Sequence, residues 1–581
     1  MSTCTLPAAA HPNAAHSPSD IVTSPSVQPP WTTNLVLSIW LALAGNLPLG
    51  YRLLTLEGGS ARLSVLLCLF LAIGFLVFAL LSLLTWPRLH RVAALVLVLS
   101  SAIGSHFMAS YGVVIDSSML ANALGTDSAE VRDLVSLRLV AHVLLVAGPP
   151  VWWLWRRPLP TRAASIRLLR NTGAAAIGVL LALASVAAGY QGLASLMRNH
   201  KSVRYMVNPL NTVYAAGRLA VDQLPQAAQA VEPVGLDARP GPSYAAQVRP
   251  PLLVIVVGET VRAENFGLDG YARPTTPVLA DWQRRRGLVN FSNVTACGTN
   301  TEVSLPCIFS PLTREQGGNR KPRHENLLDV LQRAGLAVLW LDNQSGCKGV
   351  CDRVPHDSTR ATAETPGCAE GECHDEVLLD SLDQRLAALD PERRARGVVL
   401  VLHQMGSHGP AYHKRTPARF KPFGPECQSQ TLSDCSPEEL RNAYDNTVAY
   451  TDHVLGRTLQ WLDARSDRFD TGMVYVSDHG ESLGEAGLYL HGLPFALAPS
   501  QQTRVPMVSW LSPGLLARAG LDAACLGQRA NRPVSHDHIF HSVLGLMDVV
   551  TEVRDEQLNL FIPCGQHNAV LKPGKKQPAA S

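Results

Sequence analysis

The sequence predicts two parts: an α-helical membrane domain of about five transmembrane helices, followed by an α/β domain. Its mean hydropathy is +0.08 although 17% of its residues are charged, so one segment must be strongly apolar. That segment is the amino-terminal third, whereas short apolar runs alternate with amphipathic segments from Pro250 onward. We expect four regions, which are a tail at 1–33, a membrane domain at 34–195, an interfacial helix and linker at 196–248, and an α/β domain at 249–581.

The first and third of these regions are recognised by composition. Residues 1–33 are rich in Pro, Ser and Ala and contain no Lys or Arg, which predicts a disordered tail. The tail also lacks the basic start of a cleavable signal peptide. Residues 196–248 carry mixed basic and aromatic positions and then a stretch rich in Pro, Gly and Ala. That order indicates a helix at the membrane surface followed by a linker.

Five apolar stretches in the membrane region are each close to the ~20 residues that span a bilayer. They are too long and too weakly interrupted for buried helices of a soluble domain. The predicted spans are Asn34–Leu54, Leu63–Trp86, Val92–Val114, Leu137–Trp155 and Gly173–Leu193. Because their number is odd, the two ends of the chain lie on opposite sides of the membrane.

Arginine residues in the connections between the spans indicate which side of the membrane is cytoplasmic. Cytoplasmic loops carry an excess of basic residues. The second and fourth connections hold Arg88, Arg91, Arg156, Arg157, Arg162, Arg167 and Arg170. The tail is therefore expected inside and the large domain outside.

The third connection, Asp116 to Asp133, would be the longest outer loop of the membrane domain. Asn122, Thr126 and Glu130 share helical spacing in it, so one face could contact a ligand. Spacing alone equally allows a solvated loop helix.

Ten of the twelve cysteines lie beyond residue 296, and eight of them form close pairs. Such pairs indicate short-loop disulfides in an oxidising compartment, which agrees with an outer location. Structural zinc is the alternative interpretation. The close pairs are Cys297/Cys307, Cys347/Cys351, Cys368/Cys373 and Cys427/Cys435, and Cys525 with Cys564 is left as a fifth. The formal net charge of only +3 gives no indication of nucleic-acid binding.

Polar residues follow four predicted strands at the point where each ends. Strands of an open α/β sheet gather ligands at their carboxyl ends, so these residues should meet. The strands and their followers are Leu252–Val257 with Glu259, Ala337–Leu341 with Asp342 and Asn343, Val398–Leu402 with His403 and Gln404, and Met473–Val476 with Asp478 and His479.

Glu259, Asp478 and His479 supply two carboxylates and one imidazole, a set that suits a catalytic Zn²⁺ with one open position. His408 and His491 are candidates for a second metal or for a substrate phosphate, and the alternative for each is an ordinary structural histidine. A metal held in this way acts as a Lewis acid and activates a nucleophile for hydrolysis or group transfer.

A nucleophile could come from the hydroxyl-rich loop between Cys297 and Cys307. A closed loop would fix a hydroxyl in place, and a metal would favour its alkoxide. Thr299, Thr301 and Ser304 are equal candidates from the residues alone. The alternative is a polar turn that caps a following helix.

Several long strings resemble the lipid A phosphoethanolamine transferases, a group of Gram-negative inner-membrane enzymes that includes the colistin-resistance transferases. They are VVGETVRAENFGLDGYARPTTP, CGTNTEVSLPCIFS, DNQSGCKGVCDR, LHQMGSHGPAYHKR, NAYDNTVAYTD and YVSDHGESLGEAGLYLHG. The resemblance covers the membrane region and the whole outer domain. It implies an α/β periplasmic domain of alkaline phosphatase/sulfatase type on a multi-pass inner-membrane anchor.

The resemblance also implies roles for individual residues. One zinc ion would be held tightly by Glu259, Thr301, Asp478 and His479, with Thr301 as the nucleophile, and a second ion could enter during turnover. The substrate-side residues of the family fall on Asn122, Thr126, Glu130, Ser345, Lys348, His403, His408 and His491. A monomer is expected.

The implied reaction has two steps. Thr301 takes phosphoethanolamine from phosphatidylethanolamine, and lipid A then takes it from Thr301. The added ammonium lowers the negative charge of the envelope and with it the attraction for polymyxins. Two alternatives are transfer to a core sugar of lipopolysaccharide and a metal-dependent phosphodiesterase of the same superfamily.

One residue departs from the family pattern. Glu302 follows the nucleophile where the family usually has a small or uncharged residue. If its carboxylate faced the zinc, it would compete as a ligand.

Three other classes fit the sequence less well. A sulfatase needs a Cys or Ser in a formylglycine motif, and Cys307-Ile308-Phe309 does not supply one. The Cys pairs and the HQMGSHGP string disfavour a phosphoglycerol transferase. A non-catalytic membrane scaffold would not need the complete set of Glu259, Thr301, Asp478 and His479.

Overall fold

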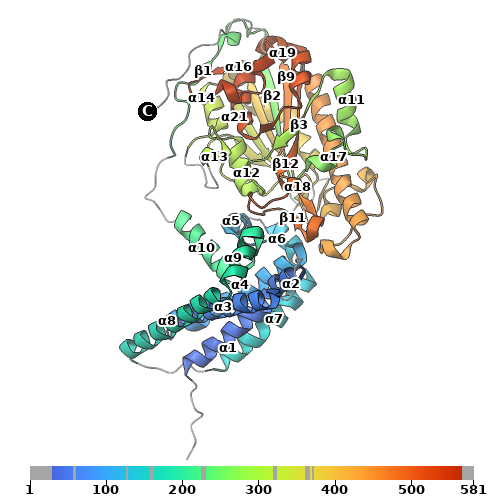
Figure 1. Ribbon diagram of the computed structural model, residues 1–581. Coiled ribbons are helices and arrows are strands. Elements are labelled where there is room, and N and C mark those ends of the chain that lie inside the picture. Colours follow the sequence, from blue (N-terminus) through green and yellow to red (C-terminus); the bar gives the residue numbers. More distant parts are fainter. Residues whose placement is uncertain are drawn as a thin grey trace, which may run out of the picture.

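The chain forms a helical bundle with an α/β domain stacked on one end of it (Figure 1). The structure is a computed structural model. It describes residues 29–55, 61–125, 128–157, 163–223, 231–317, 324–359, 367–369 and 372–564. Most of the predicted tail therefore lies outside the described residues.

Five helical segments of the bundle are long and apolar enough to cross a membrane, as predicted. They are Pro30–Thr55, which joins α1 (Pro30–Leu43), a short 3₁₀ turn (Ala44–Asn46) and α2 (Leu47–Thr55); Leu63–Leu83 within α3 (Ala61–Leu83); α4 (Leu89–Tyr111); α7 (Leu137–Trp155); and α8 (Ala164–Ala188).

The fifth span differs from its predicted limits. Helix α8 begins at Ala164 rather than Gly173, and a separate helix, α9 (Tyr190–Asn199), takes over after it ends. The predicted span followed the apolar run that begins at Gly173, whereas the helix extends further upstream through more polar residues. Arg167 and Arg170 lie instead in the early turns of the helix, where long basic side chains can reach the membrane surface.

Three further helices lie at the end of the bundle that faces the α/β domain (Figure 1). They are α5 (Ser117–Gly125), α6 (Ser128–Leu134) and α10 (Leu210–Gln223). Helix α5 packs against both α10 and the α/β domain. The predicted outer loop is thus a pair of short helices held between the two parts of the molecule.

The α/β domain is built on an eight-stranded sheet. Its strands, in spatial order, are β13 (Val534–Ser535), β3 (Val289–Thr295), β12 (Arg504–Leu511), β9 (Asp470–Ser477), β2 (Pro251–Gly258), β8 (Val398–His403), β4 (Ala337–Asp342) and β5 (His356–Ser358). The four predicted strands are the parallel group β9-β2-β8-β4. Their carboxyl ends therefore share one edge of the sheet, as expected.

Helices cover both faces of this sheet. Strand β2 shows why, since Leu253, Ile255 and Val257 belong to one apolar core and the alternating Leu252, Val254 and Val256 belong to the other. The first core includes side chains of α12 (Thr301–Ile308), α14 (Leu327–Arg333) and α21 (Asp537–Leu546). The second includes side chains of α11 (Pro277–Arg286) and α17 (Pro437–Asp463).

The remaining elements are short. The helices are α13 (Arg314–Gly317), α15 (Leu382–Ala388), α16 (Pro391–Arg396), α18 (Ser500–Thr503), α19 (Pro513–Ala519) and α20 (Ala523–Arg529). The strands are β1 (Arg239–Pro240), β6 (Cys368–Ala369), β7 (Glu372–Cys373), β10 (Ser482–Leu483), β11 (Tyr489–Leu490) and β14 (Val549–Val550).

Part of the predicted linker belongs to the α/β domain. Strand β1 pairs with β14 near the end of the chain, and the Tyr244 hydroxyl donates to the Met547 carbonyl at 2.6 Å. Residues 231–248 therefore pack on this domain, whereas the prediction began it at 249. The difference arises because a stretch rich in Pro and Gly can be ordered by its partners.

All five predicted cysteine pairs are disulfides. They are Cys297 with Cys307, Cys347 with Cys351, Cys368 with Cys373, Cys427 with Cys435, and Cys525 with Cys564. Paired sulfurs exclude the structural-zinc alternative at these positions. Cys68 is the free cysteine of the described residues, and Cys4 lies outside them.

The two cysteines of the fourth disulfide differ in their surroundings, although the sequence pattern treats them alike. Cys427 is buried in the second core, whereas Cys435 is only partly buried and packs against the edge of that core. The Cys435 N–H donates to the Leu432 carbonyl at 3.3 Å, just before α17 begins at Pro437. Cys435 thus has a structural role, because its disulfide ties the loop before α17 to the core, and it is not part of the candidate metal site.

Candidate active site

Glu259, Asp478 and His479 meet at the carboxyl edge of the sheet. Strands β2 and β9 are parallel neighbours, with Gly258 paired to Ser477. The residues that follow each strand consequently point to one place. A ligand atom of each of the three side chains lies within 4.8 Å of the others, and all three side chains are fully buried.

Hydrogen bonds leave one free ligand atom on each of two residues. Asp478 Oδ1 accepts the backbone N–H groups of Thr260, at 3.1 Å, and His479, at 2.7 Å. His479 Nδ1 donates to the Gly480 carbonyl at 3.0 Å. Asp478 Oδ2 and His479 Nε2 have no hydrogen-bond partner among the described residues, although both are buried. Buried orphan atoms of this kind fit a bound cation, and the donors suit Zn²⁺.

The three groups strongly perturb each other's pKa values. Burial and the charge of Glu259 raise the pKa of Asp478 to about 6. Burial alone would lower the pKa of His479, but the two carboxylates raise it to about 10. His479 in turn lowers the pKa of Glu259 against the effect of burial. Two buried carboxylates thus require a positive charge between them, which either a proton or a metal ion can supply.

Thr301 is the hydroxyl that faces these carboxylates. Its Oγ1 lies 3.2 Å from both carboxylate oxygens of Glu259, and the residue is buried. It is the first residue of α12, whose N-cap Asn300 accepts the Val303 N–H at 3.1 Å. The positive end of a helix favours an alkoxide at this position.

The other two candidate hydroxyls have structural partners. Thr299 Oγ1 donates to the Leu493 carbonyl at 2.6 Å, and Ser304 Oγ accepts the Gly298 N–H at 3.1 Å. Among these three described residues, the geometry selects Thr301.

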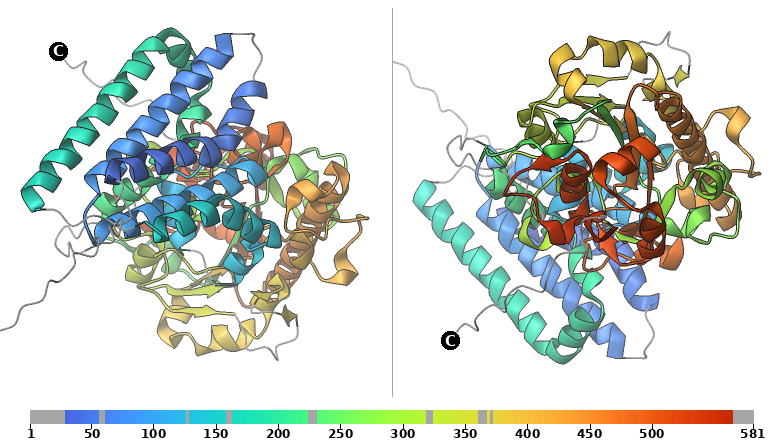
Figure 2. Two further views of the ribbon diagram at one scale, coloured as in Figure 1. Left: turned by 90° about the horizontal axis from the view of Figure 1, so that it is seen from below. Right: turned by 90° about the horizontal axis from the view of Figure 1, so that it is seen from above.

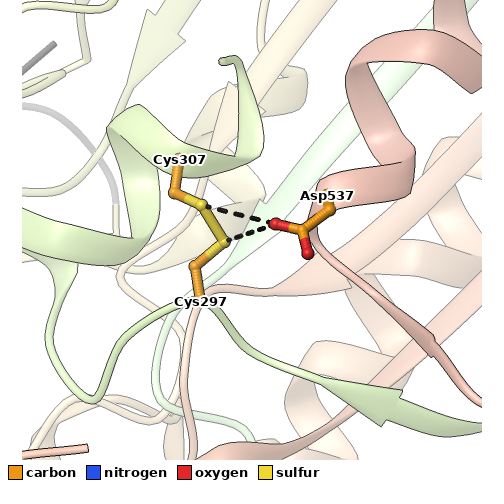
Figure 3. Close-up of side chains that lie close together, drawn as sticks. All are labelled: Cys297, Cys307 and Asp537. Atoms are coloured by element: carbon orange, nitrogen blue, oxygen red, sulfur yellow. Dashed lines mark hydrogen bonds between the residues drawn. A yellow bond between two sulfur atoms is a disulfide. The ribbon is translucent and has the colours of Figure 1, made fainter. Parts of the chain in front are cut away.

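A disulfide closes the loop that carries Thr301. Figure 3 shows Cys307, on α12, joined to Cys297 on the segment before that helix, with Asp537 beside them. Asp537 Oδ1 lies 3.6 and 4.0 Å from the two sulfurs and accepts the Arg314 N–H at 2.8 Å. Because both sulfurs are oxidised, this group offers no thiolate to a metal.

Two supporting residues were not predicted from the sequence. Thr260 has a φ of +63°, rare for a β-branched residue, and its hydroxyl donates to Glu259 Oε1 at 2.7 Å. His536 accepts the Cys297 N–H at 3.1 Å and donates to the Ser477 carbonyl at 2.9 Å. It therefore ties the loop that carries Thr301 to strand β9, which Asp478 and His479 follow. Nothing in the local sequence identifies either contact.

His408 and His491 lie beside the candidate metal site. The His491 ring centroid is 4.4 Å from that of His479 and 5.7 Å from that of His408. His491 Nδ1 also lies 3.3 Å from Glu481, a fully buried carboxyl whose pKa burial raises to about 8. These two histidines therefore lie next to the candidate metal ligands, with His491 nearer to His479 than to His408.

His403 is positioned differently from the other predicted substrate residues. It is fully buried, and its Nδ1 lies 2.9 Å from Asp342 Oδ2. Burial opposes its charged form, but Asp342 raises the pKa of His403. The pair ties β8 to β4 behind the metal ligands.

The membrane domain contacts the α/β domain at two of the predicted substrate residues, Ser345 and Lys348. Lys348 Nζ donates to Ser345 Oγ at 2.9 Å and to the carbonyl of Gly125, at the end of α5, at 3.2 Å. Asn122 lies on the same helix and is partly buried. Thr126 and the side chain of Glu130 fall outside the described residues. Helix α5 also packs against α12, which carries Thr301.

Glu302 is turned toward α5. A Cβ atom added to Gly125 would lie 3.4 Å from Glu302 Oε2. The carboxylate is not part of the cluster formed by the metal-ligand atoms. It lies in the first turn of α12, where an acidic residue is favoured by the helix dipole.

A buried ion-pair cluster joins the two parts of the molecule close to this site. Asp133 of α6 is 3% exposed and pairs with Lys414 at 2.7 Å and Arg415 at 3.1 Å. Gln430 also donates to Asp133, at 3.1 Å. We call these four residues the Asp133 clamp. It fixes α5 and α6 against the α/β domain.

The sequence matches two protein-family models. The model described as Sulfatase matches residues 251–549, which include Glu259, Thr301, Asp478 and His479. The model described as Phosphoethanolamine transferase EptA/EptB matches residues 73–224 of the helical region.

Whole-chain relatives agree with these matches. The phosphoethanolamine transferase EptA of Salmonella typhimurium is 39% identical over 82% of this chain and 86% of its own length. The phosphatidylethanolamine transferase Mcr-1 of Escherichia coli is 36% identical over 79% of this chain and 83% of its own. A solved structure, the integral membrane lipooligosaccharide phosphoethanolamine transferase A of Neisseria meningitidis, superposes with a TM-score of 0.86. It is 34% identical and covers 92% of this chain and 98% of its own.

Proposed function

The chain belongs to the phosphoethanolamine transferases of the EptA and Mcr type, and from this premise we propose which reaction it performs. It moves phosphoethanolamine from phosphatidylethanolamine to lipid A through a covalent intermediate on Thr301. The observation that carries the proposal is the position of the Thr301 hydroxyl. It is buried at a helix N-terminus, 3.2 Å from both oxygens of Glu259.

The location of the protein gives this reaction its setting. It is an integral membrane protein with five transmembrane helices and a periplasmic carboxyl-terminal domain. Both substrates are lipids, so the membrane anchor confines enzyme, donor and acceptor to one surface. The end of α5 lies against Lys348, so a lipid head group that enters from the membrane would pass both.

Zinc would be held by Glu259, Thr301, Asp478 and His479. Once bound, it supplies Lewis-acid chemistry, which stabilises the alkoxide and the charge that develops on the phosphoryl oxygens. One tight site accounts for the orphan atoms of Asp478 and His479. A second ion during turnover would have to use residues such as His408 and His491.

The first step forms the intermediate. The Thr301 oxygen attacks the phosphorus of phosphatidylethanolamine, a Thr301–phosphorus ester forms, and the bond to the diacylglycerol oxygen breaks. The Thr301 proton has Glu259 as its nearest acceptor. His491 and His408, which lie beside His479, are placed to protonate the leaving oxygen.

The second step regenerates the enzyme. A phosphate oxygen of lipid A attacks the same phosphorus, and the bond to Thr301 breaks as Thr301 recovers a proton. The product carries an added ammonium group. Its reduced negative charge weakens the attraction for cationic polymyxins, so expression should raise polymyxin resistance. We propose that the enzyme acts as a monomer.

Reconstitution of the purified protein with head-group-labelled phosphatidylethanolamine and lipid A tests this proposal. Label should move to lipid A in the wild type and not in Thr301→Ala, whereas Thr299→Ala should retain transfer. In a parallel reaction with intact lipopolysaccharide as acceptor, label found only on its core sugars would identify the other acceptor. Label released as free phosphoethanolamine would support a hydrolase instead.

A further inference from the structure

A cavity of about 530 Å³ opens in the membrane domain, away from the catalytic site. It lies between α1, α3 and α8, which Figure 2 shows side by side in the view from below. Its walls are largely apolar and aromatic. They include Trp31, Phe78, Trp86, Ala174 and Ile177.

Two arginines line the same cavity. Arg167 and Arg170 are three residues apart on α8, so they lie on one face of that helix. The guanidinium of Arg167 lies 5.8 Å from the centre of the Trp86 ring. The cavity thus combines a cationic group of side chains with apolar walls.

Buried polar side chains form a fixed floor between the helices. Asn34 of α1 donates to Ser82 of α3 at 3.3 Å and to Thr85 at 3.0 Å. Asn171 of α8 donates to the Thr85 carbonyl at 2.8 Å. All four residues line the cavity and are at most 9% exposed. These bonds tie the three helices to one another at the wall of the cavity.

The cavity belongs to the cytoplasmic half of the membrane. The carboxyl-terminal domain is periplasmic, so with five spans α1 and α8 begin on the cytoplasmic side and α3 ends there. The lining residues come from these three helix ends, namely Pro30, Trp86 and Arg167 among others. The catalytic centre lies at the opposite end of the bundle (Figure 1).

We propose that this cavity binds an anionic phospholipid of the cytoplasmic leaflet. The phosphate would lie against Arg167 and Arg170, and part of an acyl chain would run along the apolar walls. A zwitterionic phospholipid is disfavoured, because its ammonium group would lie beside two guanidinium groups. The bound lipid would therefore differ in class from the phosphatidylethanolamine that we propose as donor, and would join α1, α3 and α8.

Native mass spectrometry of the full-length protein in detergent tests the charge requirement. Phosphatidylglycerol and phosphatidylethanolamine with identical acyl chains are titrated separately. We expect phosphatidylglycerol to bind at least tenfold more tightly, and Arg167→Gln/Arg170→Gln to remove that preference. The matched control is Arg156→Gln, because Arg156 lies near the same surface over the Trp152 ring and does not line the cavity.

A steric variant tests the position without changing charge. A Cβ atom at Gly173, which lines the cavity, would meet no atom within 4 Å, so a leucine side chain there has room inside it. Gly173→Leu should weaken phosphatidylglycerol binding about tenfold. Gly148→Leu is the control, since Gly148 lies on α7 with equally open surroundings. Equal affinity for both lipids, or unchanged binding in Gly173→Leu and the arginine variant, would overturn the proposal.

Discussion

Thr301 is the residue on which the proposed mechanism depends most directly. We expect Thr301→Ala to lower the transfer rate about a thousandfold or more, because no other described hydroxyl of its loop faces Glu259. Thr301→Ser should keep part of the rate, since it retains the oxygen. Initial rates with lipid A as acceptor measure both effects. Transfer by Thr301→Ala at even a tenth of the wild-type rate would remove this threonine from the mechanism.

His536 makes stability depend on pH. Burial lowers its pKa to about 4, whereas an unfolded chain takes up this proton near pH 6.5. The stabilisation is therefore complete above pH 6.5 and is lost as the pH falls toward 4. The upper limit of this loss is roughly 3 kcal/mol. The melting temperature should drop between pH 7 and pH 5, and His536→Gln should flatten that drop.

A histidine on the surface provides the control for this measurement. His356 lies in an exposed edge strand, so His356→Gln should leave the pH dependence as it is in the wild type. An equal drop in melting temperature for wild type and His536→Gln would show that His536 does not stay neutral in the folded protein.

Candidate site residues could be predicted from the sequence where they directly follow a buried strand. Asp478 and His479 follow one buried strand and Glu259 another, so their meeting could be predicted from parallel pairing alone. The choice of Thr301 over Thr299 and Ser304 needed either a family resemblance or coordinates. His536 could not be predicted, since its two partners lie 239 and 59 residues away in the chain.

At the scale of the elements, α5 and α6 connect the membrane domain to the α/β domain that carries the candidate active site. The Asp133 clamp holds them against the α/β domain, and removing the Asp133 charge weakens the buried contacts with Lys414 and Arg415 that cross this boundary. We expect Asp133→Asn to lower kcat/KM for the lipid substrates about tenfold or more. Zinc content and the melting temperature of the α/β domain should change little, because the metal ligands do not touch the clamp.

Asp434 supplies the matched control for the clamp. It forms an exposed ion pair with Arg138 at 2.6 Å across the same boundary, and exposed pairs contribute little. Asp434→Asn should leave kcat/KM within twofold of the wild type. If Asp133→Asn and Asp434→Asn have the same kcat/KM, Asp133 does not position α5 and α6 for the reaction.

Helices and strands could be predicted from the sequence where their apolar pattern is continuous. Four buried strands and four of the five spans have nearly the expected limits. The fifth span was displaced because helix α8 includes the polar residues before Gly173, and an apolar stretch alone does not mark where such a helix begins. The sequence could not distinguish a binding face from a solvated loop in the region of α5 and α6. The distinction depends on contacts with the α/β domain, which is far away in the sequence.

At the scale of the whole molecule, removal of zinc should affect the α/β domain and leave the membrane domain unchanged. Glu259 and Asp478 are fully buried, so a metal-free protein must offset two carboxylates with protons, of which one on His479 lies nearest. Chelation should abolish transfer and lower the melting temperature of the α/β domain, and added Zn²⁺ should restore both. The helical content of the membrane bundle should not change. Full transfer by protein shown to be metal-free would exclude a metal from the mechanism.

The covalent intermediate is the central claim and can be observed directly. The purified protein is incubated with phosphatidylethanolamine and no acceptor, and its peptides are then mapped by mass spectrometry. We predict a phosphoethanolamine adduct on Thr301, with one diacylglycerol released for each adduct. An unmodified Thr301 in folded, zinc-loaded protein that still transfers phosphoethanolamine to lipid A would contradict the account.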